Sequence, residues 1–131
     1  ACVGKPGRGT GKGTRMCEPN GGDSAVRERV YAVIESRRGA DPQTSYVAKM
    51  FGQGRQRIAQ KVGEEAIETV IAATSGGREE MVRESADLLF MLMILWADMG
   101  VAPADVFAEL NNREGVSGIA EKKSRESGQD A

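Results

Sequence analysis

Residues 61–68 read Lys-Val-Gly-Glu-Glu-Ala-Ile-Glu, and they lie in the middle of a long predicted helix. At about 100° per residue, the charged side chains between residues 58 and 74 share an arc of about 100°; they are Lys61, Glu64, Glu65 and Glu68. The rest of this helix is apolar or small, whereas an ordinary surface helix has a wide polar face and one apolar stripe. We therefore expect the carboxylates to face a cleft rather than bulk water.

A second pair of carboxylates, Glu84 and Asp87, lies three residues apart on the next predicted helix. Carboxylates that are confined together repel one another and lose hydration, and a divalent cation offsets both costs. Mg²⁺ takes oxygen ligands and is commonly shared between carboxylates and substrate phosphates. The two pairs therefore indicate a Mg²⁺ site. The alternative is a surface salt-bridge face, in which Lys61 pairs with Glu65 at i+4.

Composition limits the classes of protein to which the chain can belong. Of its 131 residues 40% are hydrophobic and 5% aromatic, which fits one domain with a mostly aliphatic core. A net charge of -1 creates no field that would attract nucleic acid or a membrane surface. The longest apolar run, Leu88–Ala97, is too short to cross a bilayer, and no secretory signal is recognisable. We expect a soluble, cytoplasmic protein that binds neither nucleic acid nor membranes.

The chain contains no histidine, which excludes imidazole catalysis, Ser-His-Asp and Cys-His triads, and His-ligated metals. Its two cysteines, Cys2 and Cys17, form no disulfide framework, and without histidine they argue against a zinc site. The run Gly7–Thr14 superficially resembles a phosphate-binding loop, but Lys12 is followed by Gly13 and no strand precedes it. Any chemistry must therefore depend on carboxylates, Lys or Arg, hydroxyl groups and a bound ion.

The order of capping residues, glycines and prolines predicts five helices and no strand. The helices are expected at about residues 25–38, 45–51, 55–74, 79–99 and 104–112, with Gly52 and Gly54 ending the second. Residues 1–22 have little apolar content, so we expect a disordered leader there, and a disordered tail at 127–131. The folded domain is predicted to span residues 23–126, with coil from 114 to 125.

The run Leu88–Ala97 is apolar on all sides, which is typical of a helix that is buried all round. A domain with only two long helices offers little material to bury it. We therefore expect an all-α bundle that is completed by dimerisation, with helix pairs from two chains forming a four-helix core in a homodimer or higher homo-oligomer. The alternative is that the first and fifth helices cover this run within one chain.

These motifs resemble a known family. Lys61-x-Gly-Glu-Glu-x-x-Glu68 followed by Glu84-x-x-Asp87 is similar to the ExxE…ExxD signature of the MazG-like superfamily, the all-α nucleoside triphosphate pyrophosphohydrolases. Within that superfamily the chain resembles the phosphoribosyl-ATP pyrophosphatase family of histidine biosynthesis over about residues 28–126. The stretches that narrow the resemblance are Asp41–Val47, Arg57–Glu65, Glu68–Ala73, Ala86–Leu89 and Arg113–Gly118.

The resemblance implies Mg²⁺-dependent hydrolysis of the α–β phosphoanhydride of phosphoribosyl-ATP to phosphoribosyl-AMP and pyrophosphate. Such a reaction needs charge neutralisation on the phosphates and an oriented water. The metal ligands that the resemblance implies are Glu65, Glu68, Glu84 and Asp87. Glu64 is implied as a further ligand or, like Glu65, as the base that orients the water.

The resemblance also implies cationic and polar side chains that contact the substrate. Lys61 would meet a phosphate or balance the carboxylates, and Arg57 is a second phosphate candidate. Ser45, Tyr46 and Lys49 would contact the substrate, the alternative being a capping Ser45 and a packing Tyr46. Arg113 and Ser117 are weaker candidates, because their segment could simply cross a dimer.

Many members of this family are fused to phosphoribosyl-AMP cyclohydrolase or act beside it. That domain characteristically brings Cys and His ligands, so we expect here the free-standing form with a functional link to the cyclohydrolase. Two other functions stay open. One is house-cleaning hydrolysis of nucleoside triphosphates, as in other MazG-like proteins; the other is a non-catalytic helical dimer that binds a cation without turnover.

Overall fold

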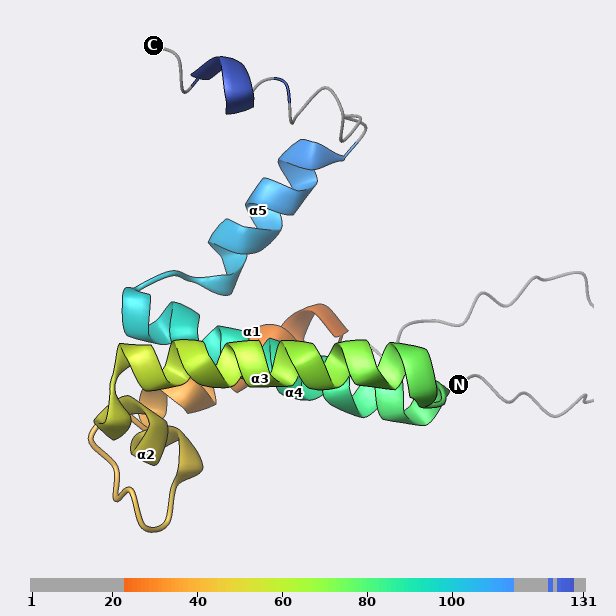
Figure 1. Cartoon of the computed structure of the whole chain (residues 1–131). Coiled ribbons are helices and arrows are strands. Elements are labelled where there is room, and N and C mark those ends of the chain that lie inside the picture. Colours follow the sequence, from red (N-terminus) through yellow and green to blue (C-terminus); the bar gives the residue numbers. More distant parts are fainter. Residues whose placement is uncertain (1–22, 115–122, 124, 129–131) are drawn as a thin grey trace, which may run out of the picture.

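A computed structural model describes residues 23–114, 123 and 125–128 of the chain (Figure 1). Within them the elements are all helical; they are α1 (Asp23–Ser36), α2 (Tyr46–Gln53), α3 (Arg55–Ser75), α4 (Arg78–Met99) and α5 (Pro103–Arg113). The predicted all-α class is confirmed, and each helix begins and ends within two residues of its expected bounds. Residues 125–128 are also helical and include the first two residues of the predicted tail. The predicted leader, and residues 115–122, 124 and 129–131, lie outside the described residues.

The short helix α2 joins α3 without a loop. The Ser45 hydroxyl accepts a hydrogen bond from the amide of Ala48 at 3.2 Å and so caps the start of α2. The helix continues through Gly52, which therefore does not end it as predicted. Gly54 does end it, with a φ of +91° that L side chains rarely adopt. The next residue already belongs to α3, so Gly54 fixes the angle between the two helices.

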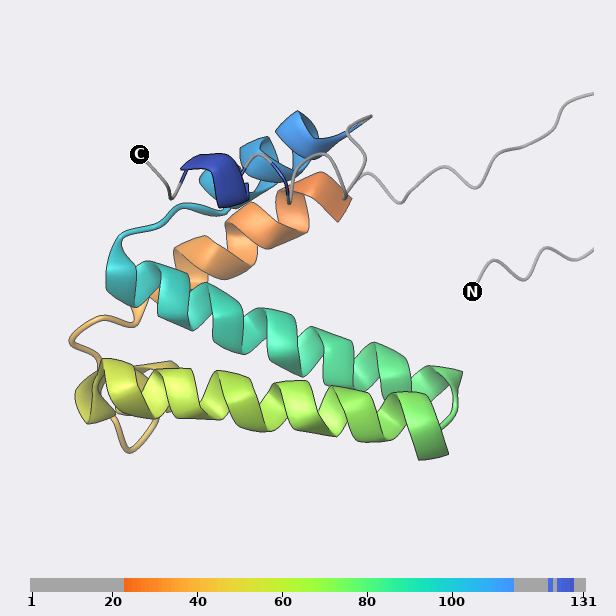
Figure 2. The same cartoon turned by 45° about the horizontal axis from the view of Figure 1, so that its top comes forward.

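The helices α3 and α4 form an antiparallel pair that lies side by side along its length (Figures 1 and 2). Helix α1 packs against α4, and α2 packs against both α3 and α4 near the start of α3. The largest fully buried side chains are aliphatic; they are Ile34, Ile58 and Ile94. Replacing one of them by alanine would cost about 2–5 kcal/mol. The α3–α4 pair is therefore the frame on which the polar residues of both helices are held.

Two arginines tie the end of α4 to its neighbours. The guanidinium of Arg38, just after α1, donates to the carbonyl oxygen of Ala97. The guanidinium of Arg55 lies 2.7 Å from the Asp98 carboxylate and donates to the Asp98 carbonyl oxygen at 3.2 Å. Gly100 then ends the helix in the left-handed region at a φ of +72°. Cations beside the last carbonyl groups of a helix are favourable, so these contacts stabilise this end of the bundle.

Helix α5 leaves the pair at an angle of 112° to α4 and contacts α1 (Figure 1). Leu89 on α4 remains 41% exposed, so one side of α4 is open. Within one chain the run Leu88–Ala97 is thus not buried on every side, and α1 and α5 do not complete its cover. No single described helix is long and apolar enough to cross a membrane; α4 and α5 meet that test only together, as a bent pair.

Candidate active site

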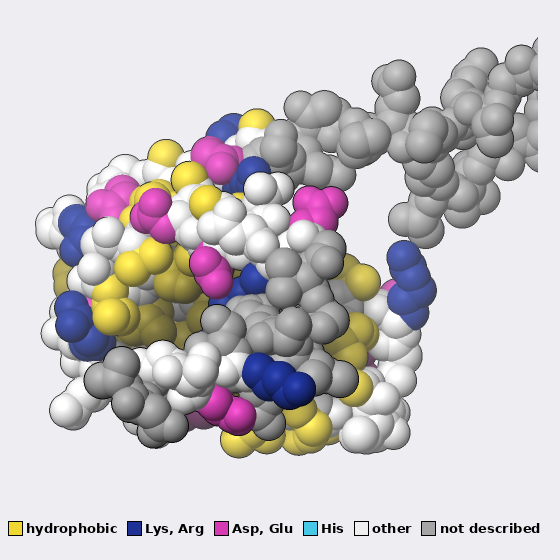
Figure 3. All heavy atoms as spheres, turned by 90° about the horizontal axis from the view of Figure 1, so that it is seen from above, with side chains coloured by type: hydrophobic (Ala, Val, Ile, Leu, Met, Phe, Trp, Pro, Cys, Tyr) yellow, Lys and Arg dark blue, Asp and Glu magenta, His cyan; other side chains and the backbone are white. Residues whose placement is uncertain are grey.

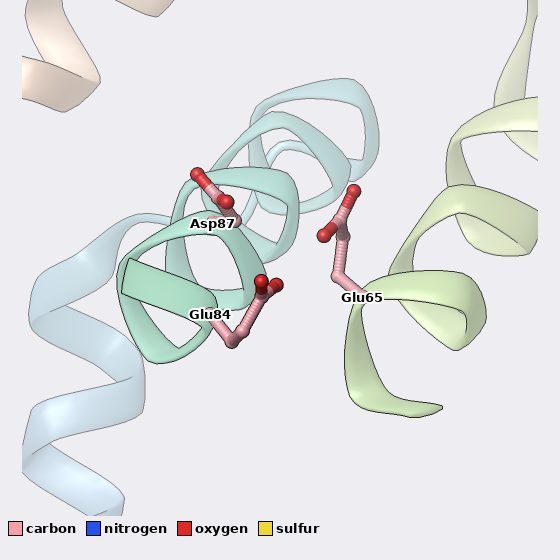
Figure 4. Close-up of side chains that lie close together, drawn as sticks. All are labelled: Glu65, Glu84 and Asp87. Atoms are coloured by element: carbon pink, nitrogen blue, oxygen red, sulfur yellow. The ribbon is translucent and has the colours of Figure 1, made fainter. Parts of the chain in front are cut away.

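Three carboxylates meet between the two longest helices (Figure 4). Glu65 comes from α3, whereas Glu84 and Asp87 come from α4, and one oxygen of each lies within 4.8 Å of the other two. The spacing of three residues places Glu84 and Asp87 one above the other on the same face of α4. The structure therefore brings together three of the four residues that were predicted as metal ligands.

The fourth predicted ligand, Glu68, is exposed to solvent and is not part of this group. It lies three residues after Glu65, so the two side chains differ in direction by about 60° around the helix axis. That Glu68 is a fourth ligand stays a prediction. Its carboxyl is nevertheless near enough to contribute to a raised pKa of Glu65, and Glu68 borders the group.

The group is partly withdrawn from water and short of positive charge. The Glu65 side chain is 14% exposed. Burial raises the pKa of Glu65, and the neighbouring Glu68 raises it further against the opposing effect of Lys61. On α4, the Oε2 atom of Glu84 is buried and has no hydrogen-bond partner among the residues that the structure describes. An unpaired, buried carboxylate oxygen is costly, and a set of hard oxygen donors suits Mg²⁺ or another hard divalent cation.

Glu64, the carboxylate beside the group, is paired with cations instead. Lys61 Nζ lies 3.2 Å from Glu64 Oε2 and 3.5 Å from Glu65 Oε1. Arg57 and Gln60 each place a side-chain nitrogen 3.4 Å from Glu64 Oε1. The hydrogen bond from Lys61 is the main reason that the pKa of Glu64 is lowered. The salt-bridge alternative thus describes Glu64 well. Within the described part of the chain, no ion pair involves the facing carboxylates Glu84 and Asp87 of α4.

A hollow of about 330 Å³ opens beside the carboxylates; its lining residues are Tyr46, Glu65, Asp87, Phe90 and Met91. The Tyr46 hydroxyl lies 3.8 Å from the sulfur of Met91. Phe90 and Met91 follow Asp87 by three and four residues and so share its helix face. The sequence analysis assigned both to the core, because apolar side chains in an apolar run carry no polar signal. Their spacing from Asp87 was the available signal.

A wider hollow of about 620 Å³ lies at the start of α2; its lining residues are Pro42, Gln43, Thr44, Ser45, Tyr46 and Lys49. Ser45 has the capping role that was the alternative to a substrate contact. Tyr46 is 49% exposed and borders both hollows, so it connects them. Lys49 is exposed at the rim.

The weaker candidates do not join these residues. Arg113 lies at the end of α5, where its guanidinium is 3.0 Å from Glu109, and it lines neither hollow. Ser117 lies outside the described residues. The structure adds Thr69, whose hydroxyl contacts the backbone of both α3 and α4. The sequence analysis gave it no role, although its spacing of four residues places it on the same face as Glu65.

An all-α chain whose two longest helices bring Glu65 of the ExxE motif opposite Glu84 and Asp87 of the ExxD motif has the architecture expected of an all-α nucleotide pyrophosphohydrolase. Residues 27–114 match the family model described as phosphoribosyl-ATP pyrophosphohydrolase. The chain belongs to this family of hydrolases, which acts in histidine biosynthesis. The match contains α2, α3, α4 and every carboxylate discussed above.

Curated relatives agree with the family model. A phosphoribosyl-ATP pyrophosphatase from Paramagnetospirillum magneticum is 61% identical over 103 residues, which cover 79% of this chain and 94% of the relative. A protein of the same name from Azospirillum brasilense is 59% identical and covers the same shares. A third, from Rhodospirillum rubrum, is 59% identical over 76% of this chain and 86% of its own length. The resemblance that the motifs indicated is therefore confirmed at the level of the family.

Proposed function

We propose that this chain hydrolyses the α–β phosphoanhydride of phosphoribosyl-ATP to phosphoribosyl-AMP and pyrophosphate, with Mg²⁺ at the carboxylate group. The observation that carries the proposal is the meeting of Glu65, Glu84 and Asp87 within 4.8 Å. The names of the relatives supply the substrate, and their similarity extends over about three quarters of this chain or more.

Glu65, Glu84 and Asp87 would hold the cation, and Glu68 is near enough to join them through a change of rotamer. The partnerless oxygen of Glu84 supports this assignment, because a cation would replace the hydration that the oxygen has lost. When bound, Mg²⁺ would neutralise charge on the phosphates and lower the pKa of a bound water. Binding would also relieve the repulsion among the carboxylates.

In the reaction, the water oxygen forms a bond to the α-phosphorus while the bond from that phosphorus to the bridging oxygen breaks. The bridging oxygen leaves with pyrophosphate, and the proton of the water passes to a carboxylate. Glu64 and Glu65 are the two candidates for this role. Glu64 also holds the two cations Lys61 and Arg57 beside the site, where they would meet the charge of the phosphates.

The two hollows that meet at Tyr46 would receive the rest of the substrate. The Tyr46 ring would pack against the substrate where the hollows join, and Lys49 at the outer rim would attract a phosphate group. Ser45 would act indirectly, by holding the first turn of α2 in place.

Pyrophosphate release from phosphoribosyl-ATP, with and without Mg²⁺, tests this proposal. ATP and deoxynucleoside triphosphates serve as the comparison substrates. We expect release from phosphoribosyl-ATP that requires the metal and is weak or absent with the others. Release from free triphosphates instead would favour the house-cleaning function, and metal binding without any release would favour the non-catalytic dimer.

We further propose that a second copy of the chain covers the open side of α4 and the exposed aliphatic side chains of α3. On α3 these are Ile67, Val70 and Ile71, each more than half exposed. A hollow of about 580 Å³ with mostly apolar lining lies between α1, α4 and α5, and hydrophobic side chains gather in a recess on the face shown in Figure 3. Exposed apolar side chains in such number are typical of an interface, and a two-fold dimer would cover them on both chains.

Sedimentation of the Leu89→Asp variant tests the dimer. We expect the wild type to sediment as a dimer or higher oligomer and the variant as a smaller species, because a carboxylate on an apolar interface loses its hydration without gaining a partner. Gln56→Asp adds the same charge at an exposed polar position of α3 and is the control. A wild type that is monomeric at every concentration would contradict the proposal.

We also propose that the enzyme works in the cytoplasm and supplies phosphoribosyl-AMP to phosphoribosyl-AMP cyclohydrolase. The support is the place of the family in histidine biosynthesis.

A further inference from the structure

One hydroxyl group connects the two helices that carry the proposed metal ligands. Thr69 lies on α3, one turn after Glu65, and its side chain is partly buried. Its Oγ1 atom is 2.8 Å from the carbonyl oxygen of Glu65 and 3.3 Å from the carbonyl oxygen of Glu84. The two accepting residues are the ones whose carboxylates face each other across the site. The hydroxyl therefore links the backbones of two proposed ligands.

The contact to α4 sets Thr69 apart from an ordinary helical threonine. A threonine in a helix commonly donates to the carbonyl oxygen four residues earlier, so this contact alone does not indicate a special role for Thr69. Thr74 makes only such contacts, at 3.2 Å to the carbonyl of Val70 and 3.1 Å to that of Ile71, both within α3. Thr69 has the same local contact and, in addition, an acceptor on the opposite helix.

The position of this link along the helix pair also matters. Among the residues that the structure describes, the other side-chain cross-link between α3 and α4 joins Arg55 to Asp98 at the far end of the pair. At about 1.5 Å per residue, Arg55 lies roughly 21 Å along the axis from Thr69. Between these points the two helices pack through apolar side chains such as Ile58 of α3 and Ile94 of α4, and they face each other through the carboxylates. Near the carboxylates, the Thr69 hydroxyl therefore sets the register.

Register matters to a metal site, because ligands contributed by two helices must arrive at the correct separation together. A carboxylate group that is held at the correct separation binds a cation without first ordering two helices. We infer that Thr69 is a positioning residue, whose hydroxyl fixes α4 against α3 so that Glu84 and Asp87 meet Glu65 before a cation binds. The inference rests on the proposed function, because it assigns the support of the same site.

Mn²⁺ binding followed by electron paramagnetic resonance tests this inference without depending on turnover. Thr69→Val removes the hydroxyl and keeps the branched shape, whereas Thr69→Ser keeps the hydroxyl. Thr74→Val is the matched control, since it removes a hydroxyl that bonds only within α3. We expect Thr69→Val to weaken Mn²⁺ binding on the order of fivefold, the effect of one neutral hydrogen bond, and to broaden the bound spectrum. Thr69→Ser and Thr74→Val should both remain within about twofold of the wild type.

Wild-type affinity in a folded Thr69→Val variant would overturn the inference, and so would an equal loss in Thr74→Val. If Thr69→Val fails to fold, Thr69→Ala replaces it, because alanine removes the hydroxyl and favours the helix. The same samples separate this inference from the proposed function. Mn²⁺ binding that depends on Thr69, in a wild type that does not hydrolyse phosphoribosyl-ATP, would contradict the proposed function alone. A wild type that binds no Mn²⁺ would contradict both.

Discussion

Helix α4 carries acidic side chains at two places, and their partners differ. At its last turn, Asp98 is held by Arg55 at 2.7 Å, and Arg38 donates to the neighbouring carbonyl of Ala97. Earlier in the same helix, Asp87 and Glu84 face another carboxylate, and Glu84 has a buried oxygen with no partner. The first arrangement is complete within one chain. In the second, Lys61 lies 3.5 Å from Glu65, and among the described residues no ion pair is formed by Glu84 or Asp87.

This difference separates a structural site from a binding site. Like charges brought together by folding cost free energy until a cation arrives, so the fold has to support the carboxylate group with stability gained elsewhere. The aliphatic core and the contacts of Arg55 and Arg38 supply part of that stability. We therefore expect the substitution of Asp by Asn to lower turnover at Asp87 and to lower the free energy of unfolding at Asp98.

The largest effect is expected from Asp87→Asn. This substitution removes one charge from the carboxylate group, so the cation is held less tightly and turnover should fall by more than about 100-fold. The melting temperature without divalent cations should stay the same or rise, because repulsion in the group decreases. Steady-state kinetics with Mg²⁺ and thermal unfolding without it provide the two readouts.

Glu68→Gln sharpens the assignment of the ligands. Glu68 is exposed and outside the group of three, so a loss of turnover as large as that of Asp87→Asn would show that it becomes a ligand when the cation binds. An Asp87→Asn variant with nearly wild-type turnover would break the comparison, because the unpaired group would then have no catalytic role.

A smaller effect is expected from Asp98→Asn, the same chemical change at the other end of the helix. It weakens the ion pair with Arg55, whose side chain is 58% exposed, so the free energy of unfolding should fall by only about 0.5–1 kcal/mol. Turnover should remain within about twofold of the wild type. Unfolding in urea measures the first quantity, and loss of turnover at unchanged stability would contradict the separation of roles.

The smallest effect concerns pH. The pKa of Glu65 is raised, so between the ordinary and the raised value the folded protein binds more protons than the unfolded chain. Stability without divalent cations should therefore fall as the pH rises through this window, since the slope follows the difference in bound protons. Glu64 has the opposite effect on stability, because its pKa is lowered. The stability that it contributes is present at neutral pH and is lost as the pH falls through the lowered pKa.

Thermal unfolding in chelator, followed between about pH 4 and pH 8, measures this effect over the range in which carboxyl groups with raised pKa values titrate. The fall should be absent in Glu65→Gln and should reverse when Mg²⁺ is added, because the cation binds the carboxylate form. If stability depended on pH in the same way in the wild type and in Glu65→Gln, the titration of Glu65 would not be the source of the effect.

Features that depend on neighbours in the sequence could be predicted well. The capping hydroxyl of Ser45, the left-handed Gly100 and the spacing of apolar residues each act within one helix or turn, and they placed all five helices. The facing of Glu65 with Glu84 and Asp87 could also be predicted, because both helices carry carboxylates at a one-turn spacing.

Features that depend on how two helices meet could not be predicted. The pairing of Arg55 with Asp98 joins residues that are 43 positions apart, and nothing local indicates it. Glu68 was expected among the ligands from the resemblance to the family, and its place outside the group of three could not be predicted. The helical period shows that side chains share an arc but not which part of that arc the next helix covers. Thr69 was missed for the same reason, since its second acceptor belongs to α4.

Thermal unfolding at neutral pH with increasing Mg²⁺ tests the central claim most directly, with the wild type compared against Glu84→Gln. A ligand that binds only the folded state raises the melting temperature with its concentration. We expect a steady rise for the wild type and little or no rise for Glu84→Gln. An equal rise in both proteins, or none in the wild type, would contradict the claim that the carboxylates between α3 and α4 form a cation site.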